Sequence, residues 1–223
     1  MIDKLGVKCF IHSPYVINLS RSDGSDRKCE KCKKVPDKSC DGCADGILGA
    51  WEPVNALKAH LEYGSRLGCK GVVVHLGKKV CYTVERAIDI MRENVEKAAK
   101  YATDACPLLL ETGAGVEVLS DVEEFAQFYL SLSEETKAVC RVCLDTCHVW
   151  ASGYLPMVAL NIFIEYGVPI SLIHYNDSKD ALGSRKDRHA PIAQGKIWKN
   201  DYRQLMDIAD FGIANGIPLV FEF

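Results

Sequence analysis

The sequence predicts an α/β fold in which parallel strands alternate with covering helices and form a TIM-like (β/α) barrel. Apolar, β-rich runs recur along the chain with helical stretches between them, which is typical of a parallel sheet covered on both faces. Many of these runs end in a polar side chain, and the ends from His75 to His174 are about 29 to 36 residues apart, one βα unit each. In a barrel all such ends open on the same face, whereas an open doubly wound sheet would place ligands at one switch point.

Six strands are expected, over residues 7–12, 71–75, 107–111, 139–145, 169–175 and 217–222. Apolar residues between Val84 and Ala102 keep helical spacing, so they predict a helix after the second strand. Ser120 and Glu123 have the spacing of a capping box, which would open a helix over 121–132. Pro156 suits the first turn of a helix over 156–167, and another helix is expected over 201–214.

A complete barrel of this kind has eight strands. With six, the chain is interpreted as a shortened form or a fragment. The 223 residues, 48% of them hydrophobic, are expected to build a single domain over 1–223.

Charge and composition set limits on the setting and the partners of the protein. A net charge of −3 gives no general attraction to nucleic acid, although bound divalent cations would reverse the local field. No run approaches the roughly 18–20 apolar residues of a membrane span. The first residues lack a signal-peptide core, so an intracellular location is expected: cytoplasm, nucleus or, for a viral protein, the virion. Many of the 11 cysteines lie inside strand-like runs, such as Cys9, Cys140 and Cys143, and these are interpreted as buried thiols rather than disulfide bridges.

A polar, charged segment near residues 20–50 looks like an insertion after the first strand. Cys29, Cys32, Cys40 and Cys43 stand there in a C-x2-C-x7-C-x2-C pattern. Four thiolates with this spacing suit a tetrahedral structural zinc. Two disulfides, or free thiols in a disordered loop, are the alternatives. As a basic clip, the segment could also touch DNA phosphates.

Histidines and carboxylates at the strand ends carry the chemical prediction. Imidazoles and carboxylates gathered at one face of a barrel are the ligands of a buried multi-metal centre, and zinc suits this set better than manganese or iron. Asp187 and His189 flank Arg188, and in extended backbone the outer two side chains point the same way. The candidate ligands are His12, His75, Glu111, Asp145, His148, His174, Asp187, His189 and Glu222.

The chain resembles the endonuclease IV family (AP endonuclease family 2), the metal-dependent abasic-site endonucleases. The resemblance covers essentially everything but the cysteine-rich insertion. It depends on IHSPYVINL (11–19), VVVHLG (72–77), LLLETGAG (108–115), VCLDTCHVWASGY (142–154), IHYNDSKDALGSRKDRHAPI (173–192) and PLVFE (218–222). The chain departs from the family pattern at Ala193-Gln194-Gly195, where a Gly-Glu-Gly turn is usual. Against the family pattern, the chain is also expected to lack the first two strands and the C-terminal helix.

The resemblance implies a three-zinc site that cuts duplex DNA 5′ to an abasic site, in base excision repair. The first ion would be held by His12, His75 and Glu111. Glu111 would bridge to the second ion, which Asp145, His174 and Glu222 complete. The third would be held by His148, Asp187 and His189.

The resemblance also implies that Glu111 is the key catalytic residue and that the protein works as a monomer on DNA. Manganese is a possible substitute for zinc. Tyr15 matches a family side chain that enters the DNA, and Arg185, Arg188 and Lys186 are candidate phosphate contacts; their alternatives are a turn-packing aromatic and solvated surface charges. Two other functions stay open: a metal-dependent sugar isomerase, and an inactive zinc-dependent DNA-binding module.

Overall fold

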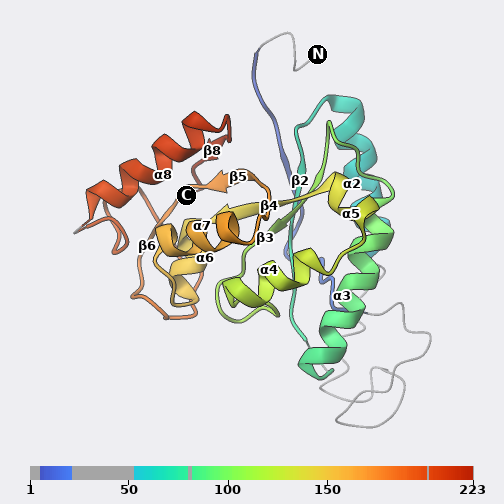
Figure 1. The fold of residues 1–223 in the computed structure, drawn as a ribbon, viewed down its shortest axis with the longest axis horizontal. Coiled ribbons are helices and arrows are strands. Elements are labelled where there is room, and N and C mark those ends of the chain that lie inside the picture. The colour runs from blue at the N-terminus through green and yellow to red at the C-terminus, as the bar shows by residue number, and fades with distance from the viewer. Residues whose placement is uncertain (1–5, 22–52, 80–81, 200, 223) are drawn as a thin grey trace. The chain divides into compact units, whose positions relative to one another are not determined.

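The computed structural model describes residues 6–21, 53–79, 82–199 and 201–222 (Figure 1). The chain forms two compact units. The first takes the described residues up to Leu108 together with Leu132–Cys140, and the second takes Leu109–Ser131 with the described part of Arg141–Phe223. The boundary therefore falls inside two strands, β3 (Leu108–Glu111) and β4 (Cys140–Asp145). Each unit is described below by itself.

The described residues of the first unit form two parallel strands and three helices. The strands β1 (Ile11–His12) and β2 (Val72–His75) pair in register Ile11 with Val72 and His12 with Val73. The helix α2 (Pro53–Leu67) packs on α3 (Val84–Ala99), and α3 packs on α5 (Glu134–Val139). Residues of β2 are buried along its length, as expected for a strand covered by helices.

In the second unit the strands lie in the order β3-β4-β5-β8. The strand β5 (Ile170–His174) pairs in parallel with β4 on one side and with β8 (Leu219–Val220) on the other. The helices α4 (Val122–Leu130), α6 (Thr146–Ala151) and α8 (Tyr202–Ala214) each contact α7 (Pro156–Glu165). A small antiparallel pair, β6 (Asp177–Ser178) with β7 (His189–Ala190), follows β5.

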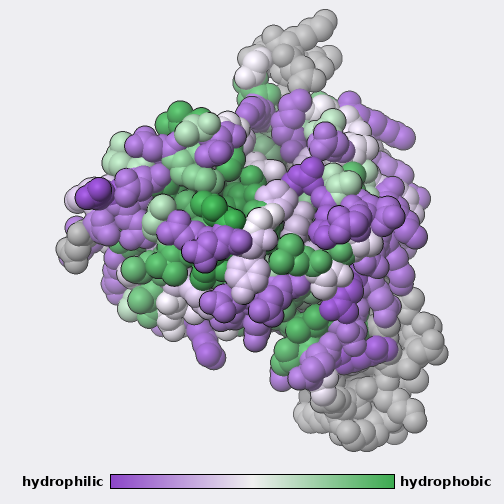
Figure 2. All heavy atoms as spheres, viewed as in Figure 1, coloured by the Kyte–Doolittle hydropathy of each residue, from purple (hydrophilic) through white to green (hydrophobic). Residues whose placement is uncertain are grey.

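Apolar side chains on α7 divide between the core and the surface. Leu160 and Phe163 are completely buried, whereas Val158 and Ile164 are about half exposed. In Figure 2 apolar side chains are visible on the surface of the second unit. Among the described residues, no helix combines the length and the apolar character that crossing a membrane requires.

Each predicted strand contains an observed strand, always shorter than expected, so the predicted order of strands is confirmed. The helices over 84–99, 122–130, 156–165 and 202–214 confirm four helical predictions, with Pro156 in the first turn of α7. The short helices α5 and α6 and the β6–β7 pair were not predicted.

The predicted cap of α4 is wrong by one residue. The N-cap is Asp121, whose Oδ1 accepts hydrogen bonds of 3.0 Å from the backbone N–H groups of Glu123 and Glu124. Ser120 points elsewhere, because its hydroxyl donates to the Glu117 carbonyl. A carboxylate at this position also complements the positive end of the helix dipole, which a hydroxyl does less well.

We predict that Asp121→Ala lowers the free energy of unfolding by about 1 kcal/mol, because two N–H groups of α4 lose their acceptor. Asp121 also accepts a hydrogen bond from the Tyr154 hydroxyl, so its loss affects two elements. Ser120→Ala is the matched control and should have a smaller effect. Urea denaturation of the two variants measures the difference, and a larger loss for Ser120→Ala would restore the capping-box interpretation.

Candidate metal centre

Four of the predicted ligands meet at the strand ends of the second unit. Glu111, Asp145 and His174 are the last residues of β3, β4 and β5, and Glu222 lies two residues beyond β8. In the register of the sheet, Asp145 stands opposite His174, and His174 opposite Val220. Glu111 and Asp145 have no exposed surface and His174 is 3% exposed. Parallel pairing therefore collects these side chains in a buried place.

One imidazole nitrogen of this group faces three carboxylates. His174 Nδ1 lies 2.8 Å from Glu111 Oε1, 3.1 Å from Glu222 Oε2 and 3.7 Å from Asp145 Oδ2. Carboxylate oxygens only accept hydrogen bonds when ionised, and burying several of them without a cation is very unfavourable. The arrangement therefore calls for protons or metal ions among these oxygens.

A second cluster in the same unit consists of His148, Asp187 and His189. The Nε2 atoms of the two histidines lie 3.2 and 3.0 Å from the two oxygens of Asp187. One ligand atom from each of the three residues lies within 4.8 Å of the others, the spacing of ligands around a single ion. His148 lies in α6, whose first turn is capped by Asp145. Asp187 lies just before β7, and His189 is the first residue of β7.

The hydrogen-bonding of His148 tests whether a metal fits this cluster. Its Nδ1 lies 2.8 Å from the carbonyl oxygen of Thr112, an atom that can only accept, so the ring hydrogen is on Nδ1. A neutral His148 then directs the Nε2 lone pair at the Asp187 carboxylate. Two acceptors at this separation repel each other unless a cation joins them, and a zinc ion bound by both would do so. The residues therefore fit the metal.

The acid-base state of these histidines reflects the same crowding. Burial lowers the pKa of His148, but the Asp145 and Asp187 carboxylates and Glu111 raise it well above its ordinary value. The pKa of His189 is also raised: burial lowers it, but the Asp187 and Asp145 carboxylates raise it by more. Protons thus balance the carboxylates when no metal is bound, and metal binding would release them.

Two buried cysteines beside the centre were not predicted as site residues. Cys143 forms a close group with Glu111 and His174, and Cys147 with Asp145 and His189. Burial raises the pKa of each thiol to about 12, so both stay protonated near neutral pH. In the VCLDTCH motif Cys143 stands two residues before Asp145, the spacing that puts strand side chains on one face, and this signal could have identified it.

In the first unit, the structure brings His12 and His75 together. Their ring centroids are 5.1 Å apart, and the ring of Tyr15 stacks on His75 at 4.1 Å. His12 Nδ1 lies 3.0 Å from the Ser13 carbonyl oxygen, which assigns the ring hydrogen to Nδ1 and the lone pair to Nε2. His60, which is not one of the predicted ligands, contacts the Ser13 hydroxyl through Nδ1 at 3.1 Å. Tyr15 is 57% exposed.

The basic candidates lie in the loop before β7. Lys186 Nζ and Arg188 Nε are 3.7 and 3.9 Å from the two carboxylate oxygens of Asp180. Arg185 adopts a positive φ of 56° and donates its backbone N–H to the Ala151 carbonyl. The four cysteines of the predicted structural zinc site, Cys29, Cys32, Cys40 and Cys43, lie outside the described residues.

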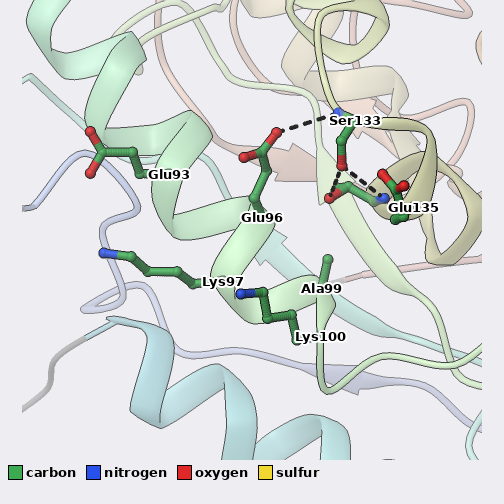
Figure 3. Close-up of a pocket in the computed structure, with 8 residues that line it drawn as sticks. Glu93, Glu96, Lys97, Ala99, Lys100, Ser133 and Glu135 are labelled. Atoms are coloured by element: carbon green, nitrogen blue, oxygen red, sulfur yellow. Dashed lines mark hydrogen bonds between the residues drawn. The ribbon is translucent and has the colours of Figure 1, made fainter.

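A pocket in the first unit is separate from these residues (Figure 3). Side chains of α3 and of the segment at the start of α5 line it, and the Ser133 N–H donates to Glu96 Oε1 across it at 3.3 Å. Its charged residues have both signs, and none of its eight lining residues is a predicted ligand. The lining residues are Glu93, Glu96, Lys97, Ala99, Lys100, Ser133, Glu135 and Thr136.

Comparison with known proteins identifies the class of fold. Residues 50–223 match the family described as Xylose isomerase-like TIM barrel, which confirms the predicted fold class. A solved structure, endonuclease IV from Thermus thermophilus, superposes with a TM-score of 0.68 at 26% identity, covering 98% of this chain and 70% of that one.

Two curated relatives narrow the class to a family. A protein of Acanthamoeba polyphaga mimivirus whose name contains the words endonuclease 4 is 34% identical over 95% of this chain. A Streptomyces coelicolor protein with the same words in its name is 30% identical over 97% of this chain. The chain belongs to the endonuclease IV family. It spans 65% of the length of the mimivirus relative and 68% of the Streptomyces one.

We predict that zinc stabilises the protein and that Asp187→Asn removes about one ion per chain. A ligand that binds only the folded state at 100 times its Kd raises the free energy of unfolding by about 2.7 kcal/mol. Asp180→Asn makes the same chemical change in the same loop, at a residue that is not a proposed ligand, and should keep the full zinc content. Elemental analysis and calorimetry measure both effects. Equal zinc content in the two variants would contradict the assignment of Asp187.

Proposed function

We propose that this protein is a zinc-dependent endonuclease that hydrolyses the phosphodiester 5′ to abasic sites in duplex DNA, leaving a 3′-hydroxyl and a 5′-deoxyribose phosphate. The role would be in base excision repair, as an intracellular monomer. The observation that carries the proposal is the convergence of carboxylates and imidazoles in the second unit. Membership of the endonuclease IV family supports the reaction class.

The proposed ligands divide into three sets. One ion takes His12, His75 and Glu111; the second shares Glu111 and adds Asp145, His174 and Glu222; the third takes His148, Asp187 and His189. The distances from His174 Nδ1 to Glu111 and Glu222, and from Asp187 to both of its histidines, support the second and third sets. Zinc is proposed because imidazole and carboxylate together suit it, and manganese is the closest substitute.

Zinc ions in such a site supply an activated water and neutralise the charge of the phosphate. The protein's own part is to fix the ligands before substrate arrives. The backbone N–H of Asp145 donates to Thr112 Oγ1 at 3.0 Å, and Asp145 Oδ1 accepts from the His148 N–H at 2.8 Å. The Thr112 carbonyl holds the His148 ring in turn. Thr112, Asp145 and His148 thus hold one another in a fixed geometry. This favours catalysis because these side chains need little rearrangement when the transition state forms.

DNA binding is proposed to involve Tyr15, Arg185, Arg188 and Lys186. An exposed aromatic ring can stack on a base or fill the gap at an abasic site, where extrusion of the nucleotide is least unfavourable. The ion pairs of Lys186 and Arg188 with Asp180 are long, and both basic side chains are more than half exposed. Such pairs contribute little to stability, so phosphate oxygens can replace the Asp180 carboxylate with little change in free energy.

A sugar-isomerase activity is the second candidate, because the matching fold family is described as xylose isomerase-like. Fold alone does not assign chemistry. Incision of an abasic duplex, measured beside an aldose–ketose assay, separates the two activities. DNA binding without incision by zinc-loaded protein would instead favour the inactive module.

We predict that Glu111→Gln abolishes incision of an abasic duplex, a loss of at least about 10²–10³-fold, the effect of removing one group that stabilises the charge of a transition state. Glutamine keeps the size of the side chain and one oxygen but loses the charge needed to bridge two ions. The control is Glu165→Gln at the end of α7, which should cut like wild type. Wild-type rates for metal-loaded Glu111→Gln protein would refute the proposal.

We predict that Tyr15→Ala weakens binding to abasic duplex about tenfold, since stacking on a base contributes roughly 1–3 kcal/mol. Zinc content should stay unchanged. Tyr63→Ala is a matched control, because Tyr63 is 61% exposed on α2 and Tyr15 is 57% exposed. Fluorescence anisotropy with abasic and intact duplexes gives the affinities. If both variants bind like wild type, Tyr15 is a surface aromatic with no part in recognition.

A further inference from the structure

Asn176, two residues after the ligand His174, contacts two of the proposed ligands with one side chain. It is 2% exposed and belongs to the second unit. Its Nδ2 lies 2.7 Å from Asp145 Oδ2 and 3.4 Å from Glu222 Oε2, and its Oδ1 lies 2.9 Å from the backbone nitrogen of Glu222. Asn176 was not among the residues predicted from the sequence to form the site.

The partners leave only one orientation for the amide. A backbone N–H can only donate, so the atom facing the Glu222 nitrogen must be the oxygen. The amide nitrogen then faces the carboxylates of Asp145 and Glu222, which can only accept when ionised. An aspartate would lack the donor and a leucine would lack both functions. An amide side chain therefore meets the requirements of this position.

Hydrogen bonds with Thr146 and Trp198 fix the main chain of Asn176, and this directs its side chain toward the Asp145 and Glu222 carboxylates. Its N–H donates to Thr146 Oγ1 at 2.8 Å, and its carbonyl accepts from Thr146 Oγ1 at 2.7 Å and from the Trp198 indole at 3.0 Å. Trp198 is completely buried. Because Thr146 follows Asp145 directly, these hydrogen bonds link the peptide of Asn176 to the backbone next to the proposed ligand Asp145.

Glu222 lies beyond the end of its strand. The strand β8 ends at Val220, whose carbonyl accepts from the Tyr175 N–H at 2.7 Å. Past that point, Asn176 binds both the backbone and the carboxylate of Glu222. The Glu222 side chain is 29% exposed, in contrast to the buried Asp145. Asn176 thereby holds Glu222, which lies beyond a short strand, close to Asp145, which the sheet buries.

We propose that Asn176 is a positioning residue that holds Asp145 and Glu222 in the geometry of the second metal site. This inference rests on the zinc centre proposed above. Outer partners of metal ligands commonly contribute about 10–100-fold to metal affinity, because they fix the ligands before the ion arrives. An Asn176 that only joined β5 to β8 would contribute to folding and leave zinc affinity unchanged.

The test is zinc retention by Asn176→Ala protein, measured by competition with a colorimetric chelator. We expect retention of one ion to weaken about 10–100-fold. Asn94→Ala is the matched control: Asn94 is 5% exposed on α3 and donates to the Leu19 and Arg21 carbonyls, so its loss removes buried hydrogen bonds away from the proposed ligands. Asn94→Ala should lower thermal stability and keep wild-type zinc retention. Wild-type retention by Asn176→Ala would overturn the inference.

A double-mutant cycle with Glu222→Ala shows whether Asn176 acts through this ligand. Asn176→Ala should weaken zinc retention less in the Glu222→Ala protein than in wild type, because one of the two ligands that Asn176 holds is already gone. Fully additive effects would overturn the inference. If the alanine variant is not recovered folded, Asn176→Ser provides the same comparison, and wild-type retention by it counts equally against the role of Asn176. Absence of zinc from the wild-type protein would refute the proposed function itself.

Discussion

Burial of negative charge at the strand ends is the constraint on which the rest of the second unit depends. Glu111 and Asp145 are completely buried, and the side chains of Asp187 and Glu222 are only partly exposed. Ionised carboxylates in such a place are tolerated only when cations or strong donors satisfy them. Histidine side chains, backbone N–H groups and the Asn176 amide supply part of this compensation. The remaining carboxylate oxygens and histidine nitrogens lie within 4.8 Å of one another in groups of three, a spacing that suits metal ions.

A further buried carboxylate, Asp177 in β6, holds the segment that follows β7. It accepts from the backbone N–H groups of Gly195 and Ile197, both at 2.9 Å. Any Cβ at Gly195 would lie 2.3 Å from Asp177 Oδ1, so glycine is required there. Ala193 has a positive φ of 64°, a conformation that glycine adopts more easily. The chain thus keeps the glycine that packing demands and accepts strain at Ala193.

Sequence reasoning located the ends of the strands well because apolar runs mark them, and the strands β2 to β5 end at the predicted residues. It failed where no periodic pattern exists. The β6–β7 pair has two residues in each strand, too few to show alternation. The capping box at Ser120 was misassigned because Asp121 offers a stronger acceptor in the next position. Asn176 was missed because its role depends on Asp145 and Glu222, residues distant in sequence.

Under the proposed function, the charge of the chain would make substrate binding depend on metal loading. A net charge of −3 gives the chain no general attraction to a phosphate group, and without metal the protonated histidines of the centre only offset its carboxylates. Divalent ions bound there would reverse the local sign. Lys186 and Arg188 add little attraction of their own while Asp180 lies beside them. Under the proposed function, the bound ions would therefore supply most of the attraction of the centre for a phosphate group, and metal-loaded protein would bind DNA more tightly than protein without metal.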